Sequence, residues 1–187
     1  MRSDAELLDH ILAHIDNGTT DLGEDEWLEP VENYVSQARF DAERRLLRRL
    51  PAPFCPVAAL PETGSYVARN SAGVPIVVVR DDKGTIRAFR NACRHRGMKL
   101  ADGNGCTKIF RCNYHGWAYR LDGRLEYVPH EHGFPELDKD SNGLVPVHAV
   151  EVQSGLVFVT HADPIGLAAL ESMPHLLTED QVLIDSN

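Results

Sequence analysis

The first fifty residues carry apolar side chains at helical spacing. In the first stretch they recur every three or four positions: Leu7, Leu8, Ile11, Leu12 and Ile15. Such spacing places them on one face of an amphipathic helix. Ser3 with Glu6 forms the sequence of a capping box, and Asn17-Gly18 is a typical helix end. A first helix is therefore expected to begin just after Ser3.

A second helix is predicted farther along this segment. Ser36 is a suitable N-cap, and the apolar residues Phe40, Leu46, Leu47 and Leu50 follow it. Pro51 and Pro53 are expected to end the helix. Residues 1–50 thus form a helical N-terminal arm.

Beyond residue 50 the apolar positions fall into short runs separated by turn residues. The expected strands cover 65–68, 74–80, 85–91, 108–112, 117–121, 124–128, 145–153 and 156–160. Three hairpin turns are expected at 81–84, 122–123 and 154–155, where Asp, Ser and Gly gather. Regular short strands with such turns are typical of antiparallel β domains. We predict a mainly β, antiparallel sandwich over residues 51–163, followed by a partly helical tail over 164–187.

Charge narrows the classes of partner. The 187 residues include 19 Lys and Arg against 28 Asp and Glu, a formal net charge of −9. A phosphate backbone would repel such a chain, so no nucleic-acid partner is expected. No apolar run approaches the roughly 20 residues that span a bilayer, and the polar start lacks a secretory pattern. We expect a cytoplasmic protein with no membrane partner.

Cysteines and histidines supply the candidate chemistry. Thiols stay reduced in the cytosol, so these cysteines are considered as metal ligands before disulfide partners. Cys93 and His95 form one close pair, and Cys112 and His115 form another. Each pair directly follows an expected strand. Both pairs could therefore lie on loop tips that the sheet brings together.

The order of the Cys and His residues helps to distinguish iron from zinc. Thiolate and imidazole suit both iron and zinc. In structural zinc sites the two ligands of a pair are usually the same residue type, with two Cys followed by two His. Here each pair contains one Cys and one His. Mixed pairs suit a two-iron cluster in which each loop gives a Cys to one iron and a His to the other. A zinc-stabilised interaction module remains the alternative.

The residues around both pairs resemble a known family. The segments 91–97 (NACRHRG) and 115–119 (HGWAY), with Leu121-Asp122-Gly123, are similar to the Rieske [2Fe-2S] domain of ring-hydroxylating oxygenase α subunits. The resemblance covers about residues 35–162. It implies a Rieske-type β fold and a [2Fe-2S] cofactor. By the same resemblance, Cys93 and Cys112 bind the buried iron, and His95 and His115 bind the outer iron.

The same two boxes distinguish this sequence from the respiratory-chain branch of Rieske proteins. In the respiratory-chain branch, an extra Cys in each box forms a disulfide. Met98 and Tyr114 stand at those places here, which excludes that disulfide. Trp117 replaces a serine whose hydroxyl donates a hydrogen bond to a sulfide. We therefore predict a reduction potential toward the lower end of the Rieske range of about −150 to +300 mV.

One-electron transfer is the function that the resemblance implies. A reductase or ferredoxin would be the donor, and the mononuclear iron of an aromatic-ring-hydroxylating oxygenase would be the acceptor, in a neighbouring subunit of a homotrimer. The iron motif of such a catalytic domain does not follow the two boxes in this sequence, so no hydroxylation by this chain alone is expected. A freestanding Rieske ferredoxin is the alternative. The helical arm favours the oxygenase, since such ferredoxins begin near their first strand.

Other candidate residues have more ordinary explanations. Cys55 and Cys106 are expected to be plain buried thiols. Glu6, His10 and His14 share a helix face and could bind a metal, but a solvated helix flank is the preferred interpretation. The segment 130–132 (His-Glu-His) is expected at the surface.

Two arginines flank His95. Arg94 and Arg96 either form an electropositive rim for an acidic donor or pair with local carboxylates. Both possibilities stay open at this point.

Overall fold

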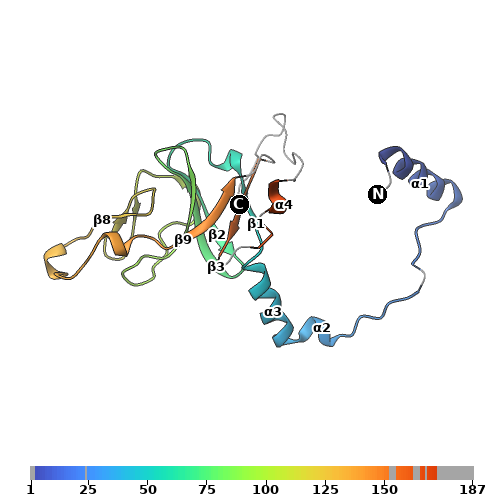
Figure 1. The fold of residues 1–187 in the computed structure, drawn as a ribbon, viewed down its shortest axis with the longest axis horizontal. Helices are drawn as coiled ribbons and strands as arrows, with labels where there is room; N and C mark the ends of the chain where they lie inside the picture. Colours follow the sequence, from blue (N-terminus) through green and yellow to red (C-terminus); the bar gives the residue numbers. More distant parts are fainter. Residues whose placement is uncertain (1–2, 24, 152–154, 162–164, 167, 172–187) are drawn as a thin grey trace. The chain divides into compact units, whose positions relative to one another are not determined.

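The computed structural model describes residues 3–23, 25–151, 155–161, 165–166 and 168–171 (Figure 1). The chain divides into two units, Met1–Arg39 and Phe40–Asn187, which are described separately. Among the described helices, none has the length and apolarity required to cross a membrane.

Helix α1 (Asp4–Asn17) dominates the first unit. Its capping box is present: the Ser3 backbone N–H donates to Glu6 Oε2 at 2.7 Å, and Ser3 Oγ accepts from the Glu6 N–H at 3.4 Å. Gly18 ends the helix in the left-handed conformation at φ 61°, which glycine adopts without steric cost. The predicted start and end are confirmed. A second, four-residue helix, α2 (Glu32–Val35), lies in the same unit.

Helix α3 (Gln37–Leu47) leads from the first unit into the second. Ser36 Oγ accepts a hydrogen bond from the Arg39 N–H at 3.4 Å, as the expected N-cap. The helix ends before Leu50, where the prediction placed its end. The carbonyls of Arg48 and Arg49 instead accept hydrogen bonds from the backbone of residues 161 and 165.

A seven-stranded sheet and a three-stranded sheet form the second unit. The large sheet contains β1 (Ala52–Pro56), β2 (Ser65–Ser71), β3 (Val74–Arg80), β4 (Ile86–Arg90), β5 (Gly103–Cys106), β9 (Pro146–Glu151) and β10 (Leu156–Thr160). Its strand order is β1-β10-β9-β4-β3-β2-β5. The small sheet contains β6 (Phe110–Arg111), β7 (Ala118–Tyr119) and β8 (Leu125–Tyr127). The strand pairings within both sheets are antiparallel, which confirms the predicted mainly β fold.

Short helical segments connect or follow these strands. They are η1 (Val57–Ala59), η2 (Glu131–Gly133), η3 (Asp140–Asn142) and α4 (Ala168–Glu171). The predicted partly helical tail is described only as far as α4, and the rest of it lies outside the described residues.

Strand β3 is the centre of the core, because apolar neighbours cover both of its faces. Val77 and Val79 belong to a cluster that reaches the small sheet and includes Cys93 and Cys112. Ile76 and Val78 belong to a second cluster, which β1, β9 and β10 complete. The first cluster therefore connects the large sheet directly to the candidate metal ligands.

Two strands were not predicted, and one of them changes the placement of a cysteine. Strand β1 contains two prolines and β5 contains two glycines, which weaken a strand pattern. Cys106 lies on β5 at the edge of the large sheet and is exposed. The prediction of a buried thiol is wrong for Cys106, because this edge strand leaves its side chain uncovered. For Cys55 it is confirmed: the side chain is buried, and burial raises the pKa of its thiol to about 11.

Candidate metal centre

Two loops with the same backbone pattern carry the predicted ligands. In the first, which follows β4, the Gly97 N–H donates to the Cys93 carbonyl at 2.8 Å. In the second, between β6 and β7, the Gly116 N–H donates to the Cys112 carbonyl at 2.9 Å. Both glycines have positive φ, 72° and 75°. Glycine allows this conformation and hence the tight turn that each loop makes behind its histidine.

A second hydrogen bond closes each loop. The Cys93 N–H donates to the carbonyl of Met98, and the Cys112 N–H donates to that of Trp117, both at 2.8 Å. Each cysteine is therefore fixed through its own backbone N–H and carbonyl. The expectation that both pairs lie at loop tips after strands is confirmed.

Asn91 fixes the far end of the first loop. Its side-chain oxygen accepts from the backbone N–H groups of Leu100 and Ala101 at 2.9 and 3.2 Å. Its side-chain nitrogen donates to the carbonyl of Ala101 at 2.7 Å. Asn91 is 3% exposed, so these bonds satisfy a buried amide. The segment between residues 91 and 101 is thereby held as one closed loop.

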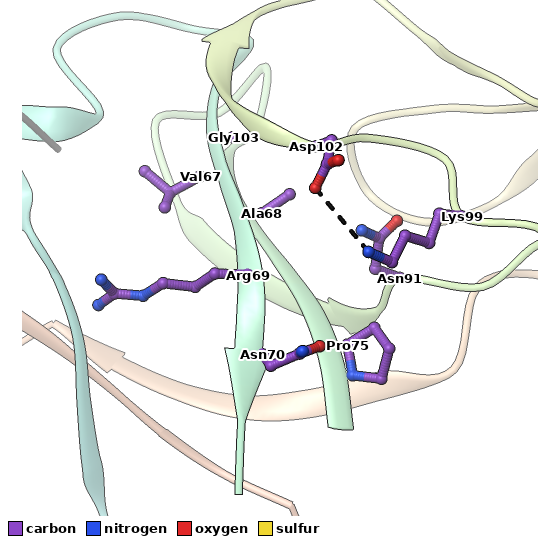
Figure 2. Close-up of a pocket in the computed structure, with 9 residues that line it drawn as sticks. All are labelled: Val67, Ala68, Arg69, Asn70, Pro75, Asn91, Lys99, Asp102 and Gly103. Carbon is purple, nitrogen blue, oxygen red and sulfur yellow. Dashed lines mark ion pairs between the residues drawn. The ribbon is translucent and has the colours of Figure 1, made fainter. Parts of the chain in front are cut away.

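A cavity of about 350 Å³ lies between strand β2 and residues of this loop (Figure 2). Its lining includes Ala68 and Asn70 of β2, Asn91, and the ion pair of Lys99 with Asp102, whose Nζ–Oδ1 distance is 3.9 Å. Figure 2 shows this ion pair on one side of β2 and the Arg69 side chain extending to the other. Asn91 and Lys99 of the loop line the cavity, and none of the four predicted ligands does.

The predicted ligands meet where the two loops approach each other. Cys93 and Cys112 are each 3% exposed, and the rings of His95 and His115 have centroids 4.8 Å apart. The Nδ1 atoms of both histidines are buried and have no hydrogen-bond partner among the described residues. An unpartnered buried nitrogen is costly, and a bond to a metal removes that cost. Two buried thiols and two inward-facing imidazole nitrogens fit a mixed Cys₂His₂ iron–sulfur cluster.

Aromatic rings hold the imidazoles in place. Trp117 stacks on His95 with centroids 5.0 Å apart and planes 6° from parallel. Phe134 meets the same imidazole edge-on at 6.0 Å, and Tyr114 lies 3.7 Å from the ring of His115. Burial and the neighbouring His115 lower the pKa of His95, which favours the neutral form that binds a metal.

Tyr119 is a residue of the site to which the sequence analysis gave no role. Its hydroxyl lies 3.2 Å from Cys93 Sγ and accepts the Arg94 N–H at 2.9 Å. With the oxygen already accepting, the hydroxyl proton is free to point at the sulfur. Burial and the bond to Cys93 raise the pKa of Tyr119, so it stays a protonated donor. The signal in the sequence was its place at the end of the HGWAY segment.

The remaining candidates in this unit are the two arginines that flank His95 and the segment 130–132. Arg94 and Arg96 are exposed, and neither has an ion pair with a carboxylate of the described residues. This favours the rim over local pairing. Residues 130–132 are exposed, as expected.

Comparison with known proteins agrees with this geometry. The family model for the Rieske [2Fe-2S] domain matches residues 51–148, which include both loops and all four predicted ligands. The chain belongs to the Rieske [2Fe-2S] domain family. The cofactor of a Rieske domain is a Rieske-type [2Fe-2S] cluster, and the donor set described above suits it.

Relatives of this Rieske domain are oxygenase subunits. The chain is 46% identical to the α subunit of biphenyl 2,3-dioxygenase from Rhodococcus jostii over 53% of this chain and 22% of that protein. It is 33% identical to the oxygenase subunit of carnitine monooxygenase from Escherichia coli strain K12, over 80% and 40% respectively. It therefore spans less than half the length of these relatives.

Solved structures point the same way. A quaternary ammonium Rieske monooxygenase superposes with a TM-score of 0.69 at 29% identity, over 73% of this chain and 39% of that one. Naphthalene 1,2-dioxygenase from Rhodococcus sp. superposes with a TM-score of 0.66 at 31% identity, over 88% and 38%. The Rieske oxygenase fold expected from the sequence is confirmed.

Proposed function

We propose that this chain is the electron-transfer part of a Rieske oxygenase. Cys93 and Cys112 bind one iron of the [2Fe-2S] cluster, and His95 and His115 bind the other. The observation that carries the assignment is the pair of buried, unpartnered Nδ1 atoms opposite two buried thiols. The cluster supplies one-electron redox chemistry when bound.

The protein residues set how the electron enters and leaves. Because Nδ1 of each imidazole points inward, the Nε2 edges are the side available to a partner. The exposed side chains of Tyr114 and Phe134 lie against these rings. A ferredoxin or reductase would dock here as donor. In a homotrimer, the same edge would face the mononuclear iron of a neighbouring subunit.

For the substrate of the complete oxygenase, we propose only a chemical class. Aromatic-ring hydroxylation was expected from the sequence, and biphenyl dioxygenase supports it. The carnitine and glycine betaine monooxygenases are also relatives, and their names denote quaternary ammonium compounds. The proposal is therefore electron supply to oxygenation, with aromatic hydroxylation as the expected case. A cytoplasmic location stays a prediction.

Reconstitution with iron and sulfide tests the assignment. We expect the reduced protein to give a Rieske electron paramagnetic resonance signal, with equal iron and acid-labile sulfide. His115→Ala should abolish that signal, because one iron loses a nitrogen ligand. His132→Ala, which changes an exposed histidine on η2, is the matched control and should retain the signal.

Two results would refute the proposal. One is a colourless protein that takes up zinc and no cluster, which would support the zinc-stabilised module instead. The other is an unchanged Rieske signal in His115→Ala.

A further inference from the structure

A second group of potential metal ligands lies in the first unit, on helix α1. His10 and His14 are one helical turn apart, so their side chains share a face. Their Nε2 atoms are 3.2 Å from each other. Asp21 Oδ1 lies 2.9 Å from Nε2 of His10 and 3.2 Å from Nε2 of His14. Three potential ligand atoms thus converge on one point.

The end of α1 brings the carboxylate to this point. Gly18 takes the left-handed conformation, and the Thr19 N–H donates to the carbonyl of His14 at 2.9 Å. The chain therefore folds back over the last turn of the helix. Asp21 comes to lie above His10 and His14, beside a pocket of about 500 Å³ that these three residues help to line.

The carboxylate in this group is not the one suggested by helical spacing. Glu6 lies four residues before His10, but its carboxylate accepts the N–H and hydroxyl of Ser3 in the capping box. Asp21 lies beyond the end of the helix and joins the group only because the chain reverses direction at Gly18. Without Asp21, the preferred interpretation of His10 and His14 was a solvated helix flank.

Thr19 holds His14 in a suitable orientation. Its hydroxyl oxygen lies 2.9 Å from Nδ1 of His14. When Nδ1–H donates to this oxygen, the lone pair of the imidazole is on Nε2, which faces His10 and Asp21. Metal-binding histidines generally use their second ring nitrogen in this way. The group thus includes both the ligand atoms and a residue that orients one of them.

Charge also favours a cation at this point. Two imidazole nitrogens at 3.2 Å repel each other unless a proton or a metal ion lies between them. Two neutral imidazoles with one carboxylate carry a single negative charge, which a divalent ion more than balances.

We propose that His10, His14 and Asp21 form a binding site for a divalent transition-metal ion of the zinc type. Two nitrogens and one oxygen suit Zn²⁺, Ni²⁺ or Cu²⁺, whereas Ca²⁺ and Mg²⁺ prefer oxygen ligands alone. The site is separate from the Cys–His loops and does not depend on the proposed electron-transfer function. Binding would tie the segment after Gly18 to helix α1.

Zinc titration of the full chain, with its iron–sulfur cluster loaded, tests the proposal. Calorimetry should show one saturable zinc site while the visible absorption of the cluster stays constant. His10→Ala should remove this site. Asp21→Asn should weaken binding by about tenfold or more, because loss of even an orienting residue typically costs about 10- to 100-fold. Thr19→Ala should weaken it by about tenfold.

Two controls keep the test specific. His132→Ala removes an exposed histidine elsewhere and should leave the zinc site intact. Circular dichroism should show that the helical content of His10→Ala equals that of the unchanged protein. Zinc uptake that persists in His10→Ala, or that parallels loss of cluster absorption, would overturn the proposal. Absence of a saturable zinc site in the unchanged chain would do the same.

Discussion

At the scale of single residues, the two ligand sulfurs differ in their surroundings. Cys93 Sγ has the Tyr119 hydroxyl at 3.2 Å, whereas no described side chain donates to Cys112 Sγ. A donor to sulfur stabilises the reduced, more negative cluster and raises its potential. Trp117 stands where the respiratory branch has a serine, and its side chain has no hydroxyl. The Tyr119 hydroxyl therefore supplies part of the stabilisation of the reduced cluster that this serine would give.

Replacing this donor should shift the potential. In Tyr119→Phe we expect a midpoint potential lower by roughly 60 mV, because a tenfold change in the equilibrium of a one-electron couple is about 59 mV. Such a change is about 1.4 kcal/mol, within the range of one hydrogen bond to a charged group. Protein-film voltammetry measures it.

The control for this variant is Tyr34→Phe, which removes a hydroxyl from an exposed residue of α2. Its potential should equal that of the unchanged protein. An unaltered potential in Tyr119→Phe would mean that the hydroxyl does not donate to the cluster.

The absolute potential is a separate prediction. The Tyr119 hydroxyl makes up only part of the effect of the serine hydroxyl that Trp117 replaces, so the expected midpoint still lies in the lower part of the Rieske range. A value above about +200 mV, near the top of that range, would contradict this interpretation.

At the scale of elements, the turn between β7 and β8 packs the small sheet against the large one. Gly123 in this turn has φ 89°, and a Cβ there would lie 2.4 Å from the Phe89 ring of β4. The Gly123 carbonyl also accepts the Leu144 N–H at 2.8 Å, so the turn cannot move freely. The close approach of the two sheets thus requires a glycine.

Gly123→Ala should therefore destabilise the protein for two reasons. The left-handed conformation costs an alanine about 1–2 kcal/mol, and overpacking against Phe89 adds about 1–3 kcal/mol. Gly84→Ala is the matched control, because Gly84 has φ 78° with no heavy atom within 4 Å of the added Cβ. Urea unfolding should show the larger loss in Gly123→Ala. Equal losses would mean that the Phe89 contact gives way without cost.

The β3–β4 hairpin depends on a buried carboxylate. Asp81 accepts the N–H groups of Lys83 and Thr85, each at 2.9 Å, and Nε of Arg87 at 2.5 Å. Burial by itself would raise the pKa of Asp81, but these hydrogen bonds outweigh it and lower the pKa. The ionised form therefore stabilises the turn.

Asp81→Asn should lower the free energy of unfolding by about 2 kcal/mol at pH 7, in the range of hydrogen bonds to a charged group. Because the folded-state pKa is lowered, this contribution is complete above the unfolded value of about 3.9 and is lost as the pH falls below it. The difference from the unchanged protein should hence shrink in acid. Asp82→Asn, at the exposed neighbouring position, is the control. A difference that is constant down to pH 3 would argue against an ionic role.

Sequence patterns predicted most elements, and the exceptions have physical causes. The run 74–80 alone predicts β3, because four consecutive buried apolar residues need a strand with both faces covered. Strand β1 is not apparent in the sequence because Pro53 is typical of a helix stop, yet an edge strand tolerates proline. Strand β5 has almost no apolar residues, and its pairing with β2 creates it.

The ligand residues could be predicted from spacing and resemblance, but their supporting contacts could not. The bond from Tyr119 to Cys93 joins residues 26 positions apart, and the ring of Phe134 reaches His95 from beyond β8. Asp21 joins His10 and His14 only through the reversal at Gly18. Such contacts depend on tertiary geometry, which no local pattern specifies.

At the scale of the whole molecule, charge is distributed unevenly. The chain carries a net charge of −9, yet two exposed arginines without ion pairs to described carboxylates flank His95. An acidic donor would be repelled by the molecule at long range and attracted at this rim. Local positive charge of this kind acts mainly on the association rate and the orientation of docking.

Arg96→Glu should therefore slow electron entry into the cluster. With an acidic ferredoxin as donor, we expect the second-order reduction rate to fall severalfold at low salt, since surface charges act mainly on association. The difference should narrow toward 0.5 M salt, because screening shortens the range of charge interactions to well under about 8 Å. Stopped-flow absorption of the cluster measures the rate. Arg45→Glu makes the same charge change on α3 and should have a smaller effect. Equal slowing by both variants would show that net charge, and not the arginine beside His95, governs the encounter.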